Sequence, residues 1–171
     1  MILPMIAQIT QVGVDAGLLE AVIRLVAAAA VGGAIGINRE LTRKPAGLRT
    51  HSLVALGCAL IVVTSDHLGS SNPGDSTSRV IQGVVAGIGF LGGGVILHAE
   101  GRTVKGLTTA ATIWVAAAAG VACGVGQWLI ALIAVVLALL VLTVGQTVED
   151  ALHRMKGDEP EDGGSNDVKT P

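Results

Sequence analysis

The sequence predicts an all-α membrane protein, a bundle of five transmembrane helices with close, glycine-rich helix packing. Three observations support this fold class. The 171 residues are 51% apolar and only 14% charged, whereas soluble domains carry about 25% charged residues. Apolar runs suited to crossing a hydrocarbon core of roughly 30 Å recur along the chain. Glycines at four-residue spacing within these runs allow two membrane helices to approach closely.

The predicted spans follow one another with short connectors: Leu18–Ile37, Ser52–Thr64, Val80–Leu97, Leu107–Val125 and Trp128–Gly145. The second is the shortest, and it reaches spanning length as about Thr50–His67 when its polar ends lie in the headgroup layer. We expect residues 1–17 to form an external segment, 18–145 the transmembrane domain, and 146–171 a short cytoplasmic tail. The tail begins as a helix extension and then loses its apolar periodicity, so most of it is predicted to be disordered.

The distribution of cations predicts the orientation. Nine of the eleven lysines and arginines fall in the connector 38–49, the connector 98–106 and the tail, all on one side of the bundle. Arg24 and Arg79 lie near the other side. Because cytoplasmic loops carry the excess of Lys and Arg, we expect the N-terminus outside and the C-terminus in the cytoplasm.

Glycine spacing predicts which helix faces pack closely. The glycines expected at helix contacts are Gly32, Gly36, Gly87, Gly89, Gly92 and Gly93. The run GIGFLG at 87–92 matches the dinucleotide pattern G-x-G-x-x-G, but it lies in a predicted membrane span, and the next carboxylate follows only eight residues later. We therefore interpret it as a bare helix surface, which packs either inside this bundle or against a partner.

The first two spans resemble the next two. Each pair has an outer arginine, a glycine-rich helix, a cationic turn, and a re-entry at Gly47-Leu48-Arg49-Thr50 or Gly106-Leu107-Thr108-Thr109. Such a pattern indicates a parallel helical-hairpin repeat about an axis along the membrane normal. Chance similarity between Ala/Gly-rich helices is the alternative explanation, and the sequence leaves both open.

Ionisable residues within or beside the spans are functional candidates, because charge in the hydrocarbon is costly. Glu20 and Arg24 are four residues apart and can pair on one helix face. They either fix the depth of the helix as an outer-edge ion pair or form a polar nook that faces the bundle and contacts Arg79, Asp66 or Asp75. No other carboxylate lies within a predicted span.

The cytoplasmic rim holds the remaining polar candidates. Pro45 ends the first helix and Gly47 is expected to permit the turn. Thr108 or Thr109 is expected to cap the fourth helix, whose N-terminus carries partial positive charge. This rim either only sets the topology or also holds an anion, such as a lipid headgroup or a partner's carboxylate. Its further candidates are Arg39, Glu40, Arg49, Thr50, His51, Arg102 and Lys105.

Three runs in order resemble the MgtC/SapB family of bacterial inner-membrane proteins: RELTRKPAGLRTHSLV at 39–54, GIGFLGGGVI at 87–96 and KGLTTAATIW at 105–114. The resemblance implies a five-span domain with an external N-terminus in the bacterial inner membrane. It implies a link to magnesium limitation and, in pathogens, to virulence, with regulation of the rotary ATP synthase rather than magnesium transport. It also marks both Arg/Gly runs and Arg79 as characteristic positions.

The chain departs from the family pattern in two places. Many members carry a cytoplasmic C-terminal ligand-binding domain, whereas about 26 residues follow the last span here. The acidic residue often found three positions before Arg79 is replaced by Ser76, with Asp75 beside it.

Three functional hypotheses remain open. The first is a regulator that packs against a membrane complex such as the ATP synthase. The second is a transporter or channel-like protein for Mg²⁺ or another small ion, and the third is a lipid-organising protein. We expect no enzymatic activity, because no nucleophile–base pair stands out. We also expect no cofactor and no nucleic-acid partner, and the sequence identifies no metal ligands. The expected partners are the lipid bilayer, a membrane complex, or a second copy in a homo-oligomer.

Overall fold

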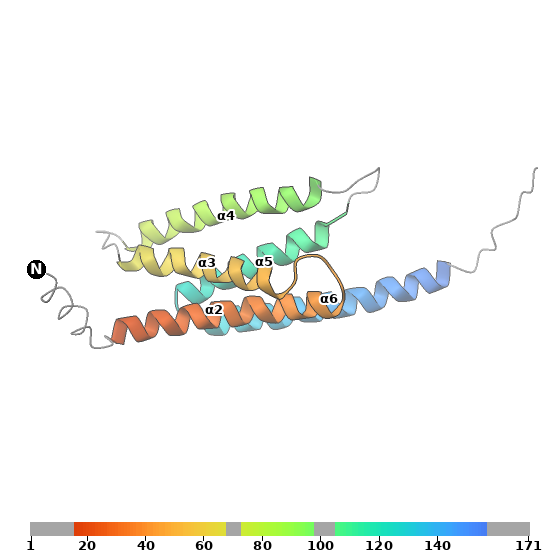
Figure 1. The fold of residues 1–171 in the computed structure, drawn as a ribbon, viewed down its shortest axis with the longest axis horizontal. Helices are drawn as coiled ribbons and strands as arrows, with labels where there is room; N and C mark the ends of the chain where they lie inside the picture. The colour runs from red at the N-terminus through yellow and green to blue at the C-terminus, as the bar shows by residue number, and fades with distance from the viewer. Residues whose placement is uncertain (1–15, 68–72, 98–104, 157–171) are drawn as a thin grey trace, which may run out of the picture. The chain divides into compact units, whose positions relative to one another are not determined.

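A computed structural model describes residues 16–67, 73–97 and 105–156. All of its regular structure is helical, and Figure 1 shows the order of the elements. The five helices are α2 (Ala16–Leu41), α3 (Leu48–His67), α4 (Pro73–Leu97), α5 (Leu107–Gly124) and α6 (Trp128–Lys156). Each is long and apolar enough to cross a membrane. The predicted all-α, five-helix membrane fold is therefore confirmed.

The chain divides into two compact units. Residues 1–139 form the first unit, which holds α2 to α5 and the start of α6, and residues 140–171 form the second. In the second unit, α6 continues as far as Lys156. The residues 146–156 are thus helical, as the expected extension of the last span requires, and the rest of the predicted tail lies outside the described residues.

The helices extend beyond the predicted spans for local reasons. Pro73 opens α4 seven residues before the predicted start at Val80, because proline has no N–H to lose and its fixed φ suits a first helical turn. At the end of α2 the helix continues to Leu41. There Lys44 N–H donates to the Arg39 carbonyl (2.9 Å) and Arg43 N–H to the Glu40 carbonyl (3.1 Å), which is the bonding of a Schellman termination.

The turn between α2 and α3 uses positive φ at residues other than glycine. Arg43 and Ala46 have φ of 54° and 56°, a region that L side chains enter at a cost. The φ of Gly47 is not positive. The expectation that Gly47 permits the turn through its backbone conformation is therefore wrong. Glycine leaves room there for the Glu40 side chain, whose Oε2 would lie 2.8 Å from a Cβ at this position and would have to shift.

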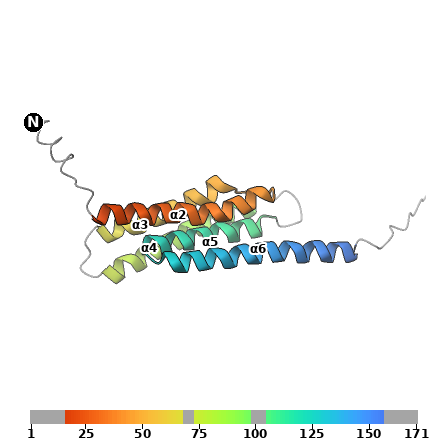
Figure 2. The same ribbon diagram turned by 90° about the horizontal axis from the view of Figure 1, so that it is seen from below.

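Helix α3 lies between the glycine faces of two neighbours. On the α2 side, a Cβ at Gly32 would meet the His51 carbonyl oxygen, and one at Gly36 would lie 2.5 Å from Leu48 Cα. On the α5 side, a Cβ at Gly120 would meet the backbone of Ala55. Figures 1 and 2 both show α3 beside α2 and α5. The backbones approach so closely that only glycine fits.

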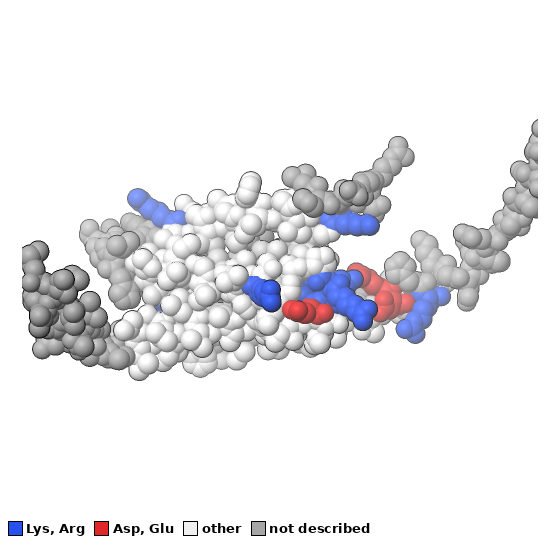
Figure 3. Space-filling model, in the orientation of Figure 1, with Lys and Arg blue, Asp and Glu red and all other residues white. Residues whose placement is uncertain are grey.

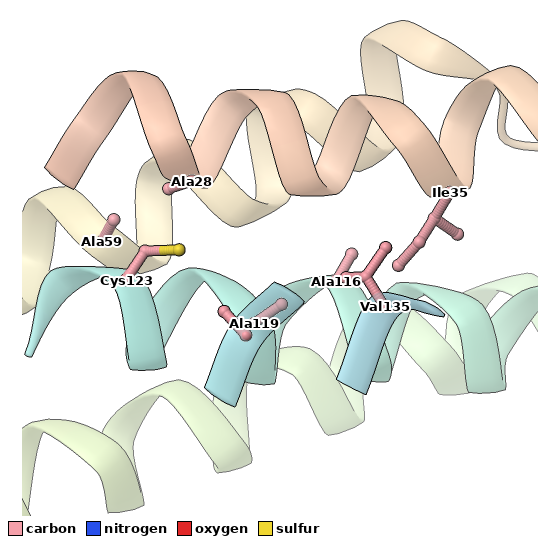
Figure 4. Packing of buried hydrophobic residues seen from close by; sticks show 8 residues of the cluster. Ala28, Ile35, Ala59, Ala116, Ala119, Cys123 and Val135 are labelled. Carbon is pink, nitrogen blue, oxygen red and sulfur yellow. The ribbon is translucent and has the colours of Figure 1, made fainter. Parts of the chain in front are cut away.

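A core of small and branched side chains fills the space between α2, α3, α5 and the start of α6. Figure 4 shows these side chains pointing toward one another from the four helices. Alanines dominate the cluster, so the helices pack close together, and Val135 anchors the first part of α6. The buried members are Ala28, Ile35, Ala59, Ala116, Ala119, Cys123, Ala131 and Val135.

Helix α4 contacts the bundle through one side only. Ile88 is buried in a second cluster with Cys58, Ile113 and Ala117, and a Cβ at Gly92 would lie 3.7 Å from Ala110 Cβ, an ordinary contact. The other glycines of α4 have no described atom within 4 Å of an added Cβ: Gly83, Gly87, Gly89, Gly93 and Gly94. The structure therefore places Gly32, Gly36 and Gly92 at internal contacts, and leaves Gly87, Gly89 and Gly93 facing outward.

The two proposed helical hairpins, α2–α3 and α4–α5, are alike at one point and differ at another. Helices α3 and α5 both begin at the leucine that follows a glycine, and in both the glycine carbonyl accepts the first helical hydrogen bond (3.3 Å to His51 N and 2.9 Å to Ala110 N). The preceding helices differ, because the glycines of α2 pack inside the bundle and most of those of α4 do not. The repeat remains a hypothesis.

Gly120→Ala is expected to destabilise the bundle by about 1–3 kcal/mol, because the new methyl group overpacks the contact with α3. Gly89→Ala is the matched control. Its methyl group enters open space, and its stability is expected to stay unchanged or rise by up to about 1 kcal/mol through helix propensity. Thermal unfolding of both variants in detergent micelles measures the difference. Equal melting temperatures would contradict the close approach of α5 to α3.

Candidate functional site

Four polar side chains are buried at one end of the first unit: Arg39, His51, Thr109 and Thr112. Arg39 comes from the last turn of α2 and His51 from the first turns of α3, while the two threonines come from the first turns of α5. Buried polar groups need hydrogen-bond partners. We call these four residues the buried polar cluster.

The cluster forms a connected hydrogen-bond chain. Arg39 Nη2 donates to Thr109 Oγ1 (2.8 Å), and Thr112 Oγ1 lies 3.0 Å from His51 Nε2. His51 Nδ1 lies 3.1 Å from the Gly47 carbonyl oxygen, which can only accept, so Nδ1 carries a proton. With a neutral ring, Nε2 then accepts from the Thr112 hydroxyl. When that hydroxyl instead donates to the Thr109 carbonyl (2.9 Å), Nε2 must be the donor.

Arg39 is an unusual member of the cluster. The side chain is only 2% exposed, and its Nε has no hydrogen-bond partner in the part of the chain that the structure describes. It also contacts no carboxylate there, and it lies beside the first turn of α5, which carries partial positive charge. This end of the bundle therefore has more positive charge than its described acidic groups balance.

Glu40 points away from this cluster and caps the next helix. Its Oε2 accepts a hydrogen bond from the backbone N–H of Leu48 (3.1 Å) at the start of α3. A carboxylate at this position satisfies one free N–H of the first turn and complements the helix dipole. Arg49 and Thr50 follow in the same turn, and both are exposed.

The predicted pair Glu20 and Arg24 forms as expected, with Arg24 Nη2 donating to Glu20 Oε1. Arg24 Nη1 also donates to the Gly124 carbonyl oxygen (2.9 Å) at the end of α5. A Schellman termination already closes this end, through Gln127 N–H to the Ala122 carbonyl (2.8 Å). Because a cation at a helix C-terminus is favourable, this arginine joins α2 to the end of α5.

The structure separates the other predicted residues. Arg79 is exposed on α4, and the side chains of Asp75 and Ser76 lie outside the described residues, as does Arg102. The N-cap of α5 is Gly106, with φ of 87° and no side-chain cap hydrogen bond. The expected capping by Thr108 or Thr109 is therefore wrong. Thr109 instead accepts from Arg39, and Thr108 is exposed.

Several contributing residues were missed by the sequence analysis. Thr112 completes the buried polar cluster, and its only signal is its position three residues after Thr109 on the same helix. Gly120 and Gly124 pack against α3, and their four-residue spacing is the same signal that identified the other glycines. Among the described residues, no group of three or more His, Cys, Asp or Glu side chains is placed to hold a metal ion.

Comparison with known proteins now identifies the family. The sequence profile of the MgtC family matches residues 25–151, a range that includes the buried polar cluster and all five helices in whole or part. The chain belongs to the MgtC family. No solved structure matches the chain.

Named relatives of this MgtC-family chain come from several bacteria. Protein SrpB of Synechococcus elongatus is 45% identical over 130 residues, which cover 70% of this chain and 71% of SrpB. Protein MgtC of Salmonella typhimurium is 44% identical over 118 residues, 69% of this chain and 49% of that protein. The putative magnesium transporter YhiD of Escherichia coli is 44% identical over 130 residues, 73% of this chain and 60% of YhiD. The chain thus spans only about half the length of the Salmonella protein.

Thr109→Val is expected to destabilise the protein by about 1–3 kcal/mol, because it leaves a further donor of buried Arg39 without an acceptor. Thr108→Val is the matched control on the neighbouring exposed position, and a change within about 0.5 kcal/mol is expected there. Thermal unfolding in detergent measures both. A loss as large in the control as in Thr109→Val would contradict the Arg39–Thr109 hydrogen bond.

Proposed function

We propose that this protein regulates another complex of the bacterial inner membrane during adaptation to low magnesium, and that it does so by helix packing. The ATP synthase is the partner to test first. The proposal includes an external N-terminus, a cytoplasmic C-terminus and a role without catalysis. The observation that carries it is the outward-facing glycine surface of α4.

Glycine pairs elsewhere in this chain indicate what such a surface is for. Gly32 and Gly36 on α2 bind one side of α3, and Gly120 and Gly124 on α5 bind the other. In each case the four-residue spacing brings two helix backbones into contact, as is typical of membrane helix pairs. Helix α4 repeats the spacing in two pairs, at 83 and 87 and at 89 and 93, without a described neighbour. Another transmembrane helix is the occupant that fits this pattern.

The shape of the α4 surface supports a helix as its occupant. Phe90 is 83% exposed, and by helical spacing it projects between the two glycine pairs, so it forms a knob between flat surfaces. Beside it, an apolar groove of about 570 Å³ runs between α3 and α4. Gly57, Gly83 and Gly87 line the groove. Packing between membrane helices depends on such complementary shapes, since lipid tails are as apolar as the side chains.

The names of the relatives support the link to magnesium. The matched proteins include MgtC of Salmonella, and YhiD is described as a putative magnesium transporter. The matched stretches cover 69% and 73% of this chain. Regulation of the ATP synthase and a role in virulence extend the proposal beyond those names.

The double variant Gly89→Leu/Gly93→Leu tests the proposal. Two bulky side chains on this face are expected to reduce co-purification of ATP synthase subunits at least about tenfold, since overpacking costs about 1–3 kcal/mol and 1.4 kcal/mol is tenfold. The protein is purified from membranes in mild detergent, and membrane potential and ATP level are measured in the same strains at low Mg²⁺. Overproduction of the wild type is expected to change both, and the variant is expected to lose this effect.

Ala30→Leu is the control, because it enlarges an exposed small residue on α2 instead of α4. It is expected to behave as the wild type. Recovery of the protein alone, with unchanged membrane potential and ATP level, would contradict regulation of this complex. Recovery of only a second copy, lost in the Gly89→Leu/Gly93→Leu variant, would replace the proposal with a homo-oligomer.

Transport of Mg²⁺ or another small ion is the second candidate, and the printed description of YhiD favours it. Proteoliposomes containing the purified chain would then take up Mg²⁺ faster than empty liposomes, as reported by an enclosed magnesium-sensitive dye. Under the regulatory proposal the two uptake rates are expected to be equal within about twofold. Packing against a partner helix provides no polar path, and the transfer of an ion into hydrocarbon is costly. A clearly faster uptake would favour the transporter.

A further inference from the structure

We propose that the turn between α2 and α3 forms a binding site for a phosphate group. The structure has a pocket of about 630 Å³ at this turn, which we call the turn pocket. Cationic side chains, backbone and one carboxylate form its walls. The lining residues are Glu40, Arg43, Lys44, Gly47, Leu48, Arg49 and Thr50.

The charge of the turn pocket favours an anion with several acceptor oxygens. Arg43, Lys44 and Arg49 contribute three positive charges and Glu40 one negative charge, which leaves a net charge of two. Figure 3 shows blue and red side chains gathered on the visible face where α2 ends. A phosphate monoester balances this net charge, whereas a phosphodiester carries one negative charge and would fit the turn pocket through its several acceptor oxygens.

The first turn of α3 adds hydrogen-bond donors that point out of the helix. The first four N–H groups of an α-helix have no acceptor within it. Glu40 accepts from the Leu48 N–H, and the next two residues of the same turn, Arg49 and Thr50, line the turn pocket. The Thr50 hydroxyl and the Arg49 guanidinium supply further donors. Helix N-termini and guanidinium groups together match the several oxygens of a phosphate.

The level of the turn pocket also fits a phosphate. The apolar span of α3 begins at Leu48, one of the pocket residues, so the turn pocket lies where hydrocarbon gives way to headgroups. The phosphate of an anionic lipid and a free phosphate anion are both available at that level. They share the chemistry that the turn pocket recognises.

Titration of the purified full-length chain with one probe at a time tests the site. In one arm, phosphatidylglycerol is added to non-ionic detergent micelles, with phosphatidylcholine as the zwitterionic comparison of zero net charge, and bound lipid is counted by native mass spectrometry. In the other arm, inorganic phosphate is added as a competitor. Saturable binding of one phosphatidylglycerol per chain is expected. Competition by inorganic phosphate would assign the site to the free anion, and its failure to compete would assign it to the lipid.

Arg49→Gln removes an exposed pocket cation that makes no hydrogen bond or ion pair within the described residues, and binding is expected to weaken at least about tenfold. Lys105→Gln is the matched control, because it removes an exposed cation that does not line the turn pocket. Its effect is expected to stay below about twofold, since a screened, distant charge contributes little. Equal losses in the two variants would overturn the site in favour of diffuse attraction to the basic surface.

Glu40→Gln has the opposite expected effect. The amide oxygen can still accept from the Leu48 N–H, so the helix cap is kept, while the only described negative charge in the turn pocket is removed. Affinity for the anionic probe is expected to rise about fivefold, the effect of one unit charge at a membrane surface. Unchanged or weaker binding in this variant, or no binding of either probe to the wild type, would overturn the proposal.

Discussion

The close approach at Ala55 determines the rest of the bundle. Its Cβ limits the space at Gly32 on α2, and its backbone limits the space at Gly120 on α5. Because α3 lies against glycine on two sides, its axis is fixed at short range without large side chains. This arrangement brings the start of α3 against the end of α2 and the first turns of α5 against both. The Arg39–Thr109 and His51–Thr112 hydrogen bonds depend on that geometry.

Glycine pairs at four-residue spacing occur on helix faces inside the bundle and also on α4, where they have no described atom within 4 Å of an added Cβ. On α2 and α5 the paired glycines are covered by α3, whereas the outward pairs on α4 are covered by no described residue. Glycine within a soluble helix would only weaken it. In a membrane it stabilises a helix when a second backbone occupies the space. The glycines of α4 that have no described atom within 4 Å of an added Cβ therefore support the proposed contact with a helix of another chain.

Composition and periodicity were sufficient to predict the fold, because span length and hydropathy are properties of each segment alone. They predicted five helices, the pairing of Glu20 with Arg24, and tight contacts at Gly32 and Gly36. They could not separate glycines that face inward from those that face outward, since this depends on the rotation of each helix. The capping by Thr109 was predicted wrongly for a related reason: its hydroxyl had a stronger donor available in Arg39, 70 residues away in the chain.

The positive charge at the α2–α3 end then requires a physical account of its own. A buried guanidinium costs several kcal/mol unless a negative charge or several acceptors compensate, and among the described residues Arg39 donates to one acceptor, the Thr109 hydroxyl. Glu40 is the nearest carboxylate in sequence, but it is directed to the N-terminus of α3. Cations that only set the membrane orientation would need neither a pocket nor a buried arginine, since orientation depends on the charge of the loops. The excess positive charge at this end of the bundle and the turn pocket therefore support the proposed phosphate site.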